Sequence, residues 1–153
     1  MNIFALDTDP TMAAQMMCDK HVVKMIVESN QMLSTVARKN GHEAPYRSTH
    51  ANHPCTLWAG ESVQNWRWLV DHSLALCEEY TRRYHRVHKS QAVSEWAESL
   101  NINLPASGLT PFRLAMPDVY KHRDPVRSYR NYYMGEKARF AKWKTGNVPV
   151  WWK

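Results

Sequence analysis

One stretch with helical spacing carries an acid, a base and a cation that together could do chemistry. His21, Lys24 and Glu28 follow one another at i, i+3 and i+7, which places them on one face of a helix. A separate apolar face, which would hold that helix in place, is formed by Val22, Ile26, Ser29, Leu33 and Val36. We interpret the polar face as a candidate active site, with a solvated helix face as the alternative.

Glu28 is the central group of this candidate site. It can pair with Lys24, although Lys before Glu is the poorer order for an ion pair along a helix. A glutamate that is buried against aromatic residues has a raised pKa and exchanges protons near neutral pH. The sequence leaves a structural and a catalytic role open.

A second candidate surface lies in the last predicted helix, which begins at Asp124-Pro125 and runs to about Trp143. Its predicted buried stripe consists of Tyr129, Tyr133, Phe140 and Trp143. Its basic residues, Arg127, Arg130, Lys137, Arg139, Lys142 and Lys144, remain for solvent or phosphate. Cations suit phosphates and aromatic rings suit exposed bases, so the helix is a candidate nucleic-acid surface. An ordinary amphipathic helix with a basic outer face is the alternative.

The overall charge favours the same kind of partner. The chain has a formal net charge of +6, which points to a polyanion. A further basic cluster stands at the end of the second long helix: Arg82, Arg83, His85, Arg86, His88 and Lys89. Because cations at a helix C-terminus are favoured by the helix dipole anyway, this cluster carries less functional weight than the last helix.

The cysteines bear on metal binding and on compartment. Cys18, Cys55 and Cys77 are too few for a disulfide framework, which favours a reducing compartment. Cys18-x-x-His21 and His50-x-x-His53-x-Cys55 could in principle supply zinc ligands, but the spacing matches no familiar finger. We therefore predict no metal and no other cofactor.

Length and patterning predict an all-α fold, a single compact helical domain with long loops over residues 1–153. Helices are expected from Asp9-Pro10 to Lys39, from His53-Pro54 through Tyr84 with an interruption near Gly60, and from Ser90 to about Leu100. Residues 2–6 are a brief strand or an extended arm, and residues 101–123 are a long irregular connection. The absence of a signal peptide and of a membrane-spanning run predicts a cytoplasmic protein with no membrane partner. No obligate protein partner is evident.

Three short motifs resemble the phage pyrimidine-dimer DNA glycosylases of the endonuclease V type. Asp19-Lys20-His21 followed by Glu28 is similar to the first long helix of that family, where an Asp-x-His precedes the catalytic glutamate at the same separation. The segment Tyr132 to Ala138 resembles the aromatic, glycine and lysine segment near the family's C-terminus, with single-residue insertions. Asn52-His53-Pro54 is similar to an Asn-His-Pro in bacterial proteins grouped with the family.

The resemblance implies a specific chemistry. Such enzymes extrude a nucleotide from a kinked duplex, and the α-amino group of the N-terminal residue attacks the sugar C1′ and displaces the base through an imine. The residue corresponding to Glu28 stabilises the cationic sugar and assists the later β-elimination. General chemistry agrees, because an α-amino group with a pKa of about 7.7–8.0 is partly neutral at cellular pH and a carboxylate stabilises developing positive charge.

Two departures from the family pattern concern the N-terminus and its charge. The family's nucleophile is a small residue exposed after methionine removal, whereas here Asn2 follows Met1. A side chain of this size hinders that removal, which predicts an amine one residue out of place. The family's arginines are replaced by Ile3 and Val27, and Lys20 and Lys24 are the candidates to supply that charge, without the bidentate fork of arginine.

We therefore expect a DNA-directed glycosylase, with or without AP-lyase activity, acting on a damaged or modified base flipped out of double-stranded DNA. The alternatives are a different nucleotide- or base-modifying enzyme on the same scaffold and a non-catalytic DNA-binding protein. The candidate catalytic residues are Glu28, His21, His53 and the N-terminal Met1 or Asn2. The candidate DNA-binding residues are Lys20, Lys24, Asn52, Trp58, Arg127, Arg130, Tyr132 and Lys137.

Overall fold

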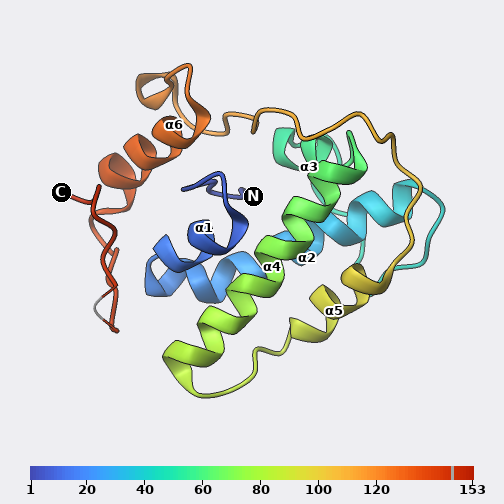
Figure 1. Cartoon of the computed structure of the whole chain (residues 1–153), viewed down its shortest axis with the longest axis horizontal. Helices are drawn as coiled ribbons and strands as arrows, with labels where there is room; N and C mark the ends of the chain where they lie inside the picture. The colour runs from blue at the N-terminus through green and yellow to red at the C-terminus, as the bar shows by residue number, and fades with distance from the viewer. Residues whose placement is uncertain (146) are drawn as a thin grey trace.

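The computed structural model describes residues 1–145 and 147–153 and is helical, with no strand among these residues (Figure 1). This confirms the predicted all-α class. Its α-helices are α1 (Pro10–Met16), α2 (Asp19–Lys39), α3 (Pro54–Ala59), α4 (Val63–Tyr84), α5 (Gln91–Ser99) and α6 (Pro125–Tyr132). A 3₁₀ turn, η1 (Asp118–Tyr120), and a π-helical turn, η2 (Tyr133–Lys137), complete the regular structure. None of the described helices is long and apolar enough to cross a membrane.

The two longest helices, α2 and α4, form the centre of the fold. Helix α4 packs against α1 and α2 on one side and against α5 on another, and the N-terminal arm enters between α1 and α6 (Figure 1). The core between these helices is built from large apolar side chains that are fully buried, including Leu33, Trp66, Leu69 and Leu76. Burial of apolar surface on this scale is the main favourable term that fixes α2 in place.

The predicted helix over residues 10–39 is in fact two helices, and the expectation of one helix is wrong. Helix α1 begins as expected, because the Asp9 carboxylate accepts hydrogen bonds from the first backbone N–H groups. It ends at Met16, and Cys18 then donates its backbone N–H to the Tyr133 hydroxyl at 3.1 Å. The Asp19 N–H donates to the Lys142 carbonyl at 2.8 Å. These tertiary bonds replace the helical ones at the break.

The second helical region is interrupted where the sequence predicted. Helix α3 ends at Ala59, and Gly60 packs closely on α2, because a Cβ there would lie 3.3 Å from a methyl group of Val36. Ser62 then starts α4, its side chain accepting a hydrogen bond from the Asn65 N–H at 3.0 Å. The chain therefore turns at this interruption, and the Ser62 side chain caps the start of α4.

The long connection over residues 100–117 crosses the ends of α3 and α4 before η1 and α6 (Figure 1). It is irregular, as predicted, but it is firmly attached. Asn65 of α4 donates from Nδ2 to the Thr110 hydroxyl at 2.8 Å and accepts the Thr110 N–H at 3.0 Å. The Tyr129 hydroxyl of α6 donates to the Arg113 carbonyl. These hydrogen bonds hold the connection in place beside the N-terminal arm.

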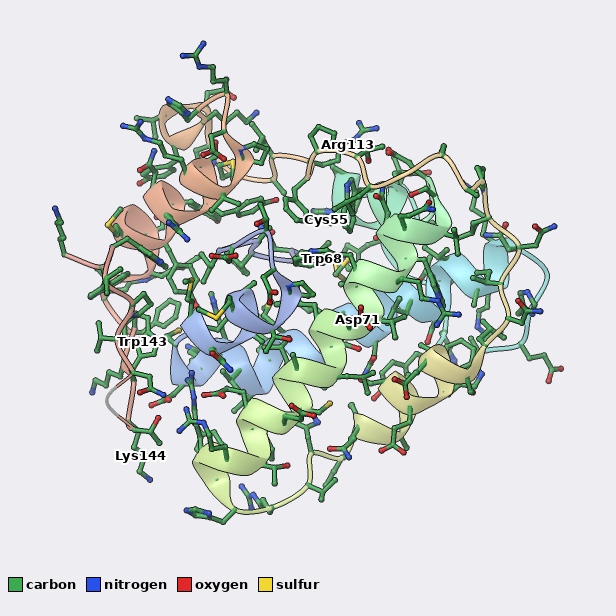
Figure 2. The ribbon with its side chains drawn as sticks, in the orientation of Figure 1. Cys55, Trp68, Asp71, Arg113, Trp143 and Lys144 are labelled. Atoms are coloured by element: carbon green, nitrogen blue, oxygen red, sulfur yellow. The ribbon has the colours of Figure 1, made fainter. Side chains whose placement is uncertain are left out.

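The last helix is shorter than predicted, and the expectation that it reaches Trp143 is wrong. Helix α6 ends at Tyr132 and continues only as the η2 turn to Lys137. Phe140 and Ala141 still donate their N–H groups to the Lys137 carbonyl, and the chain beyond them bonds to the first helices. The Trp143 indole donates to the Met16 carbonyl at 3.0 Å, and the Lys144 N–H donates to the Asp19 carboxylate at 2.8 Å. Figure 2 shows Trp143 and Lys144 in this C-terminal segment beside the start of α2.

A buried histidine connects α1 to α4 and makes stability depend on pH. His72 is completely buried, donates from Nδ1 to the Pro10 carbonyl at 2.9 Å and stacks on Trp68. Burial lowers its pKa to about 4, so the ring is neutral in the folded protein.

The unfolded chain binds a proton at His72 near pH 6.5, whereas the folded chain does so only near pH 4. We therefore expect the free energy of unfolding to fall as pH falls from about 6.5 to about 4, by at most about 1.4 kcal/mol per pH unit from this group. Urea denaturation at several pH values measures it. His72→Leu removes the titrating ring and should flatten the profile, and an unchanged slope in the variant would contradict the assignment.

Candidate active site

The N-terminal arm is fixed to the protein by the side chain of its second residue. Asn2 Oδ1 accepts the backbone N–H groups of Ile3 at 2.7 Å and Phe4 at 3.1 Å, and Asn2 Nδ2 donates to the Ala115 carbonyl at 2.9 Å. Residues 3–6 are buried and form an arm with no strand, and this arm turns at Phe4, where the Leu6 N–H donates to the Phe4 carbonyl at 2.8 Å. These bonds determine where the chain's first atoms lie.

The arm brings the N-terminal nitrogen to Glu28. The α-ammonium group of Met1 lies 3.3 Å from Glu28 Oε1, and the Asn2 backbone N–H donates to the same oxygen at 3.0 Å. Lys24 Nζ lies 3.8 Å from the other carboxylate oxygen, Oε2. Glu28 is only 8 % exposed. The expectation that an amine on Met1 would lie out of place is therefore wrong, because the nitrogens of residues 1 and 2 both contact the carboxylate.

Phe4 holds an unusual backbone conformation directly behind this contact. Its φ is +55°, in the left-handed region that bulky side chains rarely adopt. The ring compensates by packing: it stacks on His21 with centroids 4.5 Å apart and on Tyr132 at 5.9 Å. Strained backbone of this kind persists only where the surroundings determine it, and it is common at functional sites.

His21 is buried in an aromatic cluster that it forms with Phe4, Tyr132 and Tyr133. Its Nδ1 is 2.7 Å from the Tyr133 hydroxyl. Burial, followed by the positive charges of Lys137, Lys24 and Lys20, lowers its pKa to about 3. The ring is therefore neutral near pH 7, and its place between Phe4 and Tyr133 suits an orienting role better than proton transfer.

His53 stands at the start of α3, near the amine and Glu28. Its Nδ1 accepts the Cys55 N–H at 3.1 Å and caps the helix, which leaves Nε2 to carry the proton of the neutral ring. Burial and then the nearby α-ammonium group lower its pKa, whereas Glu28 raises it. Both charges therefore act on the ring, which borders the site. Asn52, the preceding residue, is exposed.

Two of the predicted DNA-binding residues lie beside the aromatic cluster. The η2 turn carries Lys137 to 4.7 Å from the centre of the half-buried Tyr132 ring and 5.6 Å from that of Phe4. The turn packs tightly, because a Cβ at Gly135 would overlap the ring of Tyr120. A cation held over aromatic rings gains from the cation–π interaction. This end of the chain therefore places a positive charge and a partly exposed ring next to the Glu28 contact.

The other predicted contacts differ in accessibility. Lys20 and Lys24 are exposed on α2, and Arg127 is exposed on α6. Arg130 is directed inward, since its Nε donates to the Leu6 carbonyl at 2.9 Å and its Nη2 lies 3.3 Å from an Asp7 carboxylate oxygen. Its guanidinium supports the N-terminal arm.

The structure contradicts the expected role of Trp58. The side chain is 1 % exposed, its indole donates to the Thr110 carbonyl at 3.1 Å, and its ring meets Trp68 edge to face. A ring buried in this way cannot stack on a base, so the expectation for Trp58 is wrong. The sequence around Trp58 gave no indication that the connection containing Thr110 covers this ring.

The residues considered as zinc ligands make other contacts in the structure. Cys18 and Cys55 are buried, and burial raises the pKa of the Cys55 thiol to about 11. Within residues 1–145 and 147–153, no three histidine, cysteine or acidic side chains are grouped as metal ligands. Cys55 lies under the connection that carries Arg113 (Figure 2), with its sulfur 3.9 Å from Asn2 Oδ1. Its contacts are those of a packing residue beneath the arm.

Fold and site together describe an all-α protein that holds its N-terminal nitrogen against a buried carboxylate. The family model for pyrimidine dimer DNA glycosylase matches residues 1–93, which include the arm, Glu28 and His53. The chain therefore belongs to the pyrimidine dimer DNA glycosylase family. Its function is of the DNA glycosylase type, and DNA is its partner. Searches of curated proteins and of solved structures return no match.

Proposed function

We propose that this protein is a DNA glycosylase with AP-lyase activity that acts on a damaged base flipped out of the duplex. The observation that supports it most is the position of Glu28 Oε1, which contacts the α-amino nitrogen of Met1 at 3.3 Å and the nitrogen of Asn2 at 3.0 Å. A chain that begins at either residue would present its amine to this oxygen. Nucleophile and carboxylate are thus already within reach of one sugar.

In the proposed reaction the neutral α-amine forms a bond to the sugar C1′, and the bond from C1′ to the base breaks. The amine loses a proton and the base leaves with one. The C1′–O4′ bond then breaks, O4′ takes up a proton to become a hydroxyl, and the opened sugar is a protonated imine whose positive charge is shared between C1′ and nitrogen. Glu28 stabilises this charge from the contact that it already makes with the amine. Loss of a C2′ proton then expels the 3′ phosphate and nicks the strand.

The surrounding residues take supporting roles in this proposal. His21, neutral at physiological pH, fixes Phe4 and with it the arm. His53, which lies close enough to the amine for its charge to act on the ring, exchanges protons with the leaving groups. Lys20, Lys24, Arg127 and Lys137 contact phosphate, and Tyr132 stacks on a base left exposed by extrusion. Asn52 contributes a polar contact next to His53.

The test uses three matched duplexes that carry a pyrimidine dimer, an abasic site or no lesion. We expect the purified protein to nick the abasic duplex and to release or cut at the dimer, with no cleavage of the undamaged duplex. Nicking of the abasic duplex alone would restrict the activity to the lyase step. Binding without cleavage of any of them would contradict the proposal and favour a non-catalytic DNA-binding protein.

A further inference from the structure

The basic cluster at the end of α4 is divided by the structure into an inner and an outer part. Arg83 is 4 % exposed, and its guanidinium bonds to Asp19 at 3.0 Å and to Glu79 at 2.8 Å. Arg82 pairs with the same Glu79 carboxylate. Two of the cations are therefore neutralised within the protein. Because these two already stand in the last turn of α4, the helix dipole does not account for the remaining basic residues.

The outer part consists of Arg86 and Lys89, and both side chains are exposed. Arg86 donates from Nε to the Tyr80 hydroxyl at 3.1 Å. Neither side chain takes part in an ion pair among the described residues. Their charges are therefore available to an external anion.

This outer part lies directly beside α2. The segment that connects α4 to α5 runs along α2, because His88 Nε2 bonds to the Val23 carbonyl at 3.1 Å and Asn30 Nδ2 donates to the Ser90 carbonyl at 2.9 Å. Lys24 follows Val23 on the exposed surface of α2, whereas the Lys20 ammonium lies 4.7 Å over the Phe140 ring, on the side of His21. Lys24, Arg86 and Lys89 thus belong to one surface.

Helix geometry places the α4–α5 segment opposite the aromatic cluster. His21 contacts Tyr133 of η2, whereas Val23 contacts His88. Residues i and i+2 of an α-helix are about 200° apart around its axis. Therefore η2 and the α4–α5 segment lie on opposite sides of α2. Lys24 projects between them, next to Glu28.

The acidic groups nearby do not cancel this charge. Asp19 and Glu79 are paired with Arg83, and Glu28 contacts the amine and Lys24. Glu78 on α4 and Glu95 on α5 are exposed and keep their charges, since Gln91, which donates to Glu95 at 3.0 Å, is neutral, but Lys24, Arg86 and Lys89 outnumber them. The side of α2 that faces the α4–α5 segment therefore keeps an excess of positive charge.

We infer that Arg86 and Lys89, together with Lys24, form a second phosphate-contact surface for duplex DNA. The inference rests on the proposed function and extends it. DNA that presents a lesion to Glu28 would cross α2, with α6 and η2 on one side and the α4–α5 segment on the other. The second surface contacts the backbone of the duplex arm that extends away from α6. It supplies affinity without base recognition.

Lys89→Gln tests this surface, with Arg67→Gln as the matched control. Arg67 is also exposed, but it lies on α4 near α5, where it donates to the Glu98 carbonyl at 3.0 Å. The probe is a labelled duplex of about 25 base pairs with a central stable abasic analogue, titrated at several salt concentrations. Removing one phosphate contact should weaken binding by about eightfold at 0.1 M salt and lower the salt slope by about one. Arg67→Gln should bind as wild type does.

A duplex shortened on one side tests the direction of the contact. When the arm that crosses the second surface is removed, Lys89→Gln should bind as tightly as wild type. If Lys89→Gln behaves as Arg67→Gln does on the long duplex, the second surface is wrong while the proposed function stands. If wild type binds neither duplex, the proposed function fails as well. A loss for Lys89→Gln that is equal on long and shortened duplexes would also overturn the inference.

Discussion

Replacing Glu28 with glutamine is expected to lower the rate of nicking at an abasic site by at least about 100-fold. The amide has the size of the carboxylate and keeps an oxygen for the Asn2 N–H, which donates to it at 3.0 Å. It lacks the negative charge that would stabilise the cationic imine next to the Met1 nitrogen. A gel assay of single-turnover cleavage measures the effect, and thermal unfolding verifies that the variant is folded.

The matched control for this variant is Glu98→Gln, which makes the same change on the exposed face of α5. It should cleave at the wild-type rate. If Glu28→Gln retains more than half of the wild-type rate while folded, the carboxylate does not serve the reaction and the central assignment is wrong.

Adding glycine and serine before Met1 should remove lyase activity to a similar extent, by about 100-fold or more. The added residues convert the reactive amine into an amide, which is not a nucleophile, and displace the new amine by up to about 7 Å. The contact between the N-terminal nitrogen and Glu28, now 3.3 Å long, would be replaced by one from an amide. Cleavage of the abasic duplex and trapping by borohydride are the measurements.

The same two residues added after Lys153 provide the control, because that end is exposed and lies outside the site. The C-terminally extended protein should react as wild type does. Undiminished trapping by the N-terminally extended protein would assign the nucleophile to another amine, such as that of Lys137 or Lys24.

The elements with local signals could be predicted from the sequence. Asp9-Pro10 and Asp124-Pro125 each combine a side-chain cap with a proline that suits the first helical position, and α1 and α6 begin there. The periodicity of α2 likewise placed Lys24 and Glu28 on a common face, where their charged groups lie 3.8 Å apart. Such patterns depend only on neighbours in sequence.

The break after Met16 and the end of α6 could not be predicted, because distant residues determine them. The first helical stretch breaks at Cys18, which bonds to Tyr133. The last helix stops early because the segment after it bonds to Met16 and Asp19. The burial of Trp58 has the same origin, since a connection 52 residues later in sequence covers its indole. Tertiary hydrogen bonds of this kind have no periodic signature.

The geometry of the arm was equally hidden. A phenylalanine with φ of +55° carries no local signal, since glycine is the residue expected there. Asn2 gave one partial signal, because its side chain commonly bonds to backbone N–H groups that follow it. Recognising Asn2 as the anchor also required its bond to Ala115, which is 113 residues away.

The measurement that tests the central claim most directly is borohydride trapping of the unmodified protein on abasic DNA, followed by mass mapping of the adduct. We expect one covalent adduct, on the α-amino nitrogen of the N-terminal peptide that contacts Glu28. The intact mass of the same sample shows whether that peptide begins at Met1 or Asn2, whose nitrogens both reach the carboxylate. An adduct on a lysine side chain, or no adduct in a preparation that binds the DNA, would contradict the account.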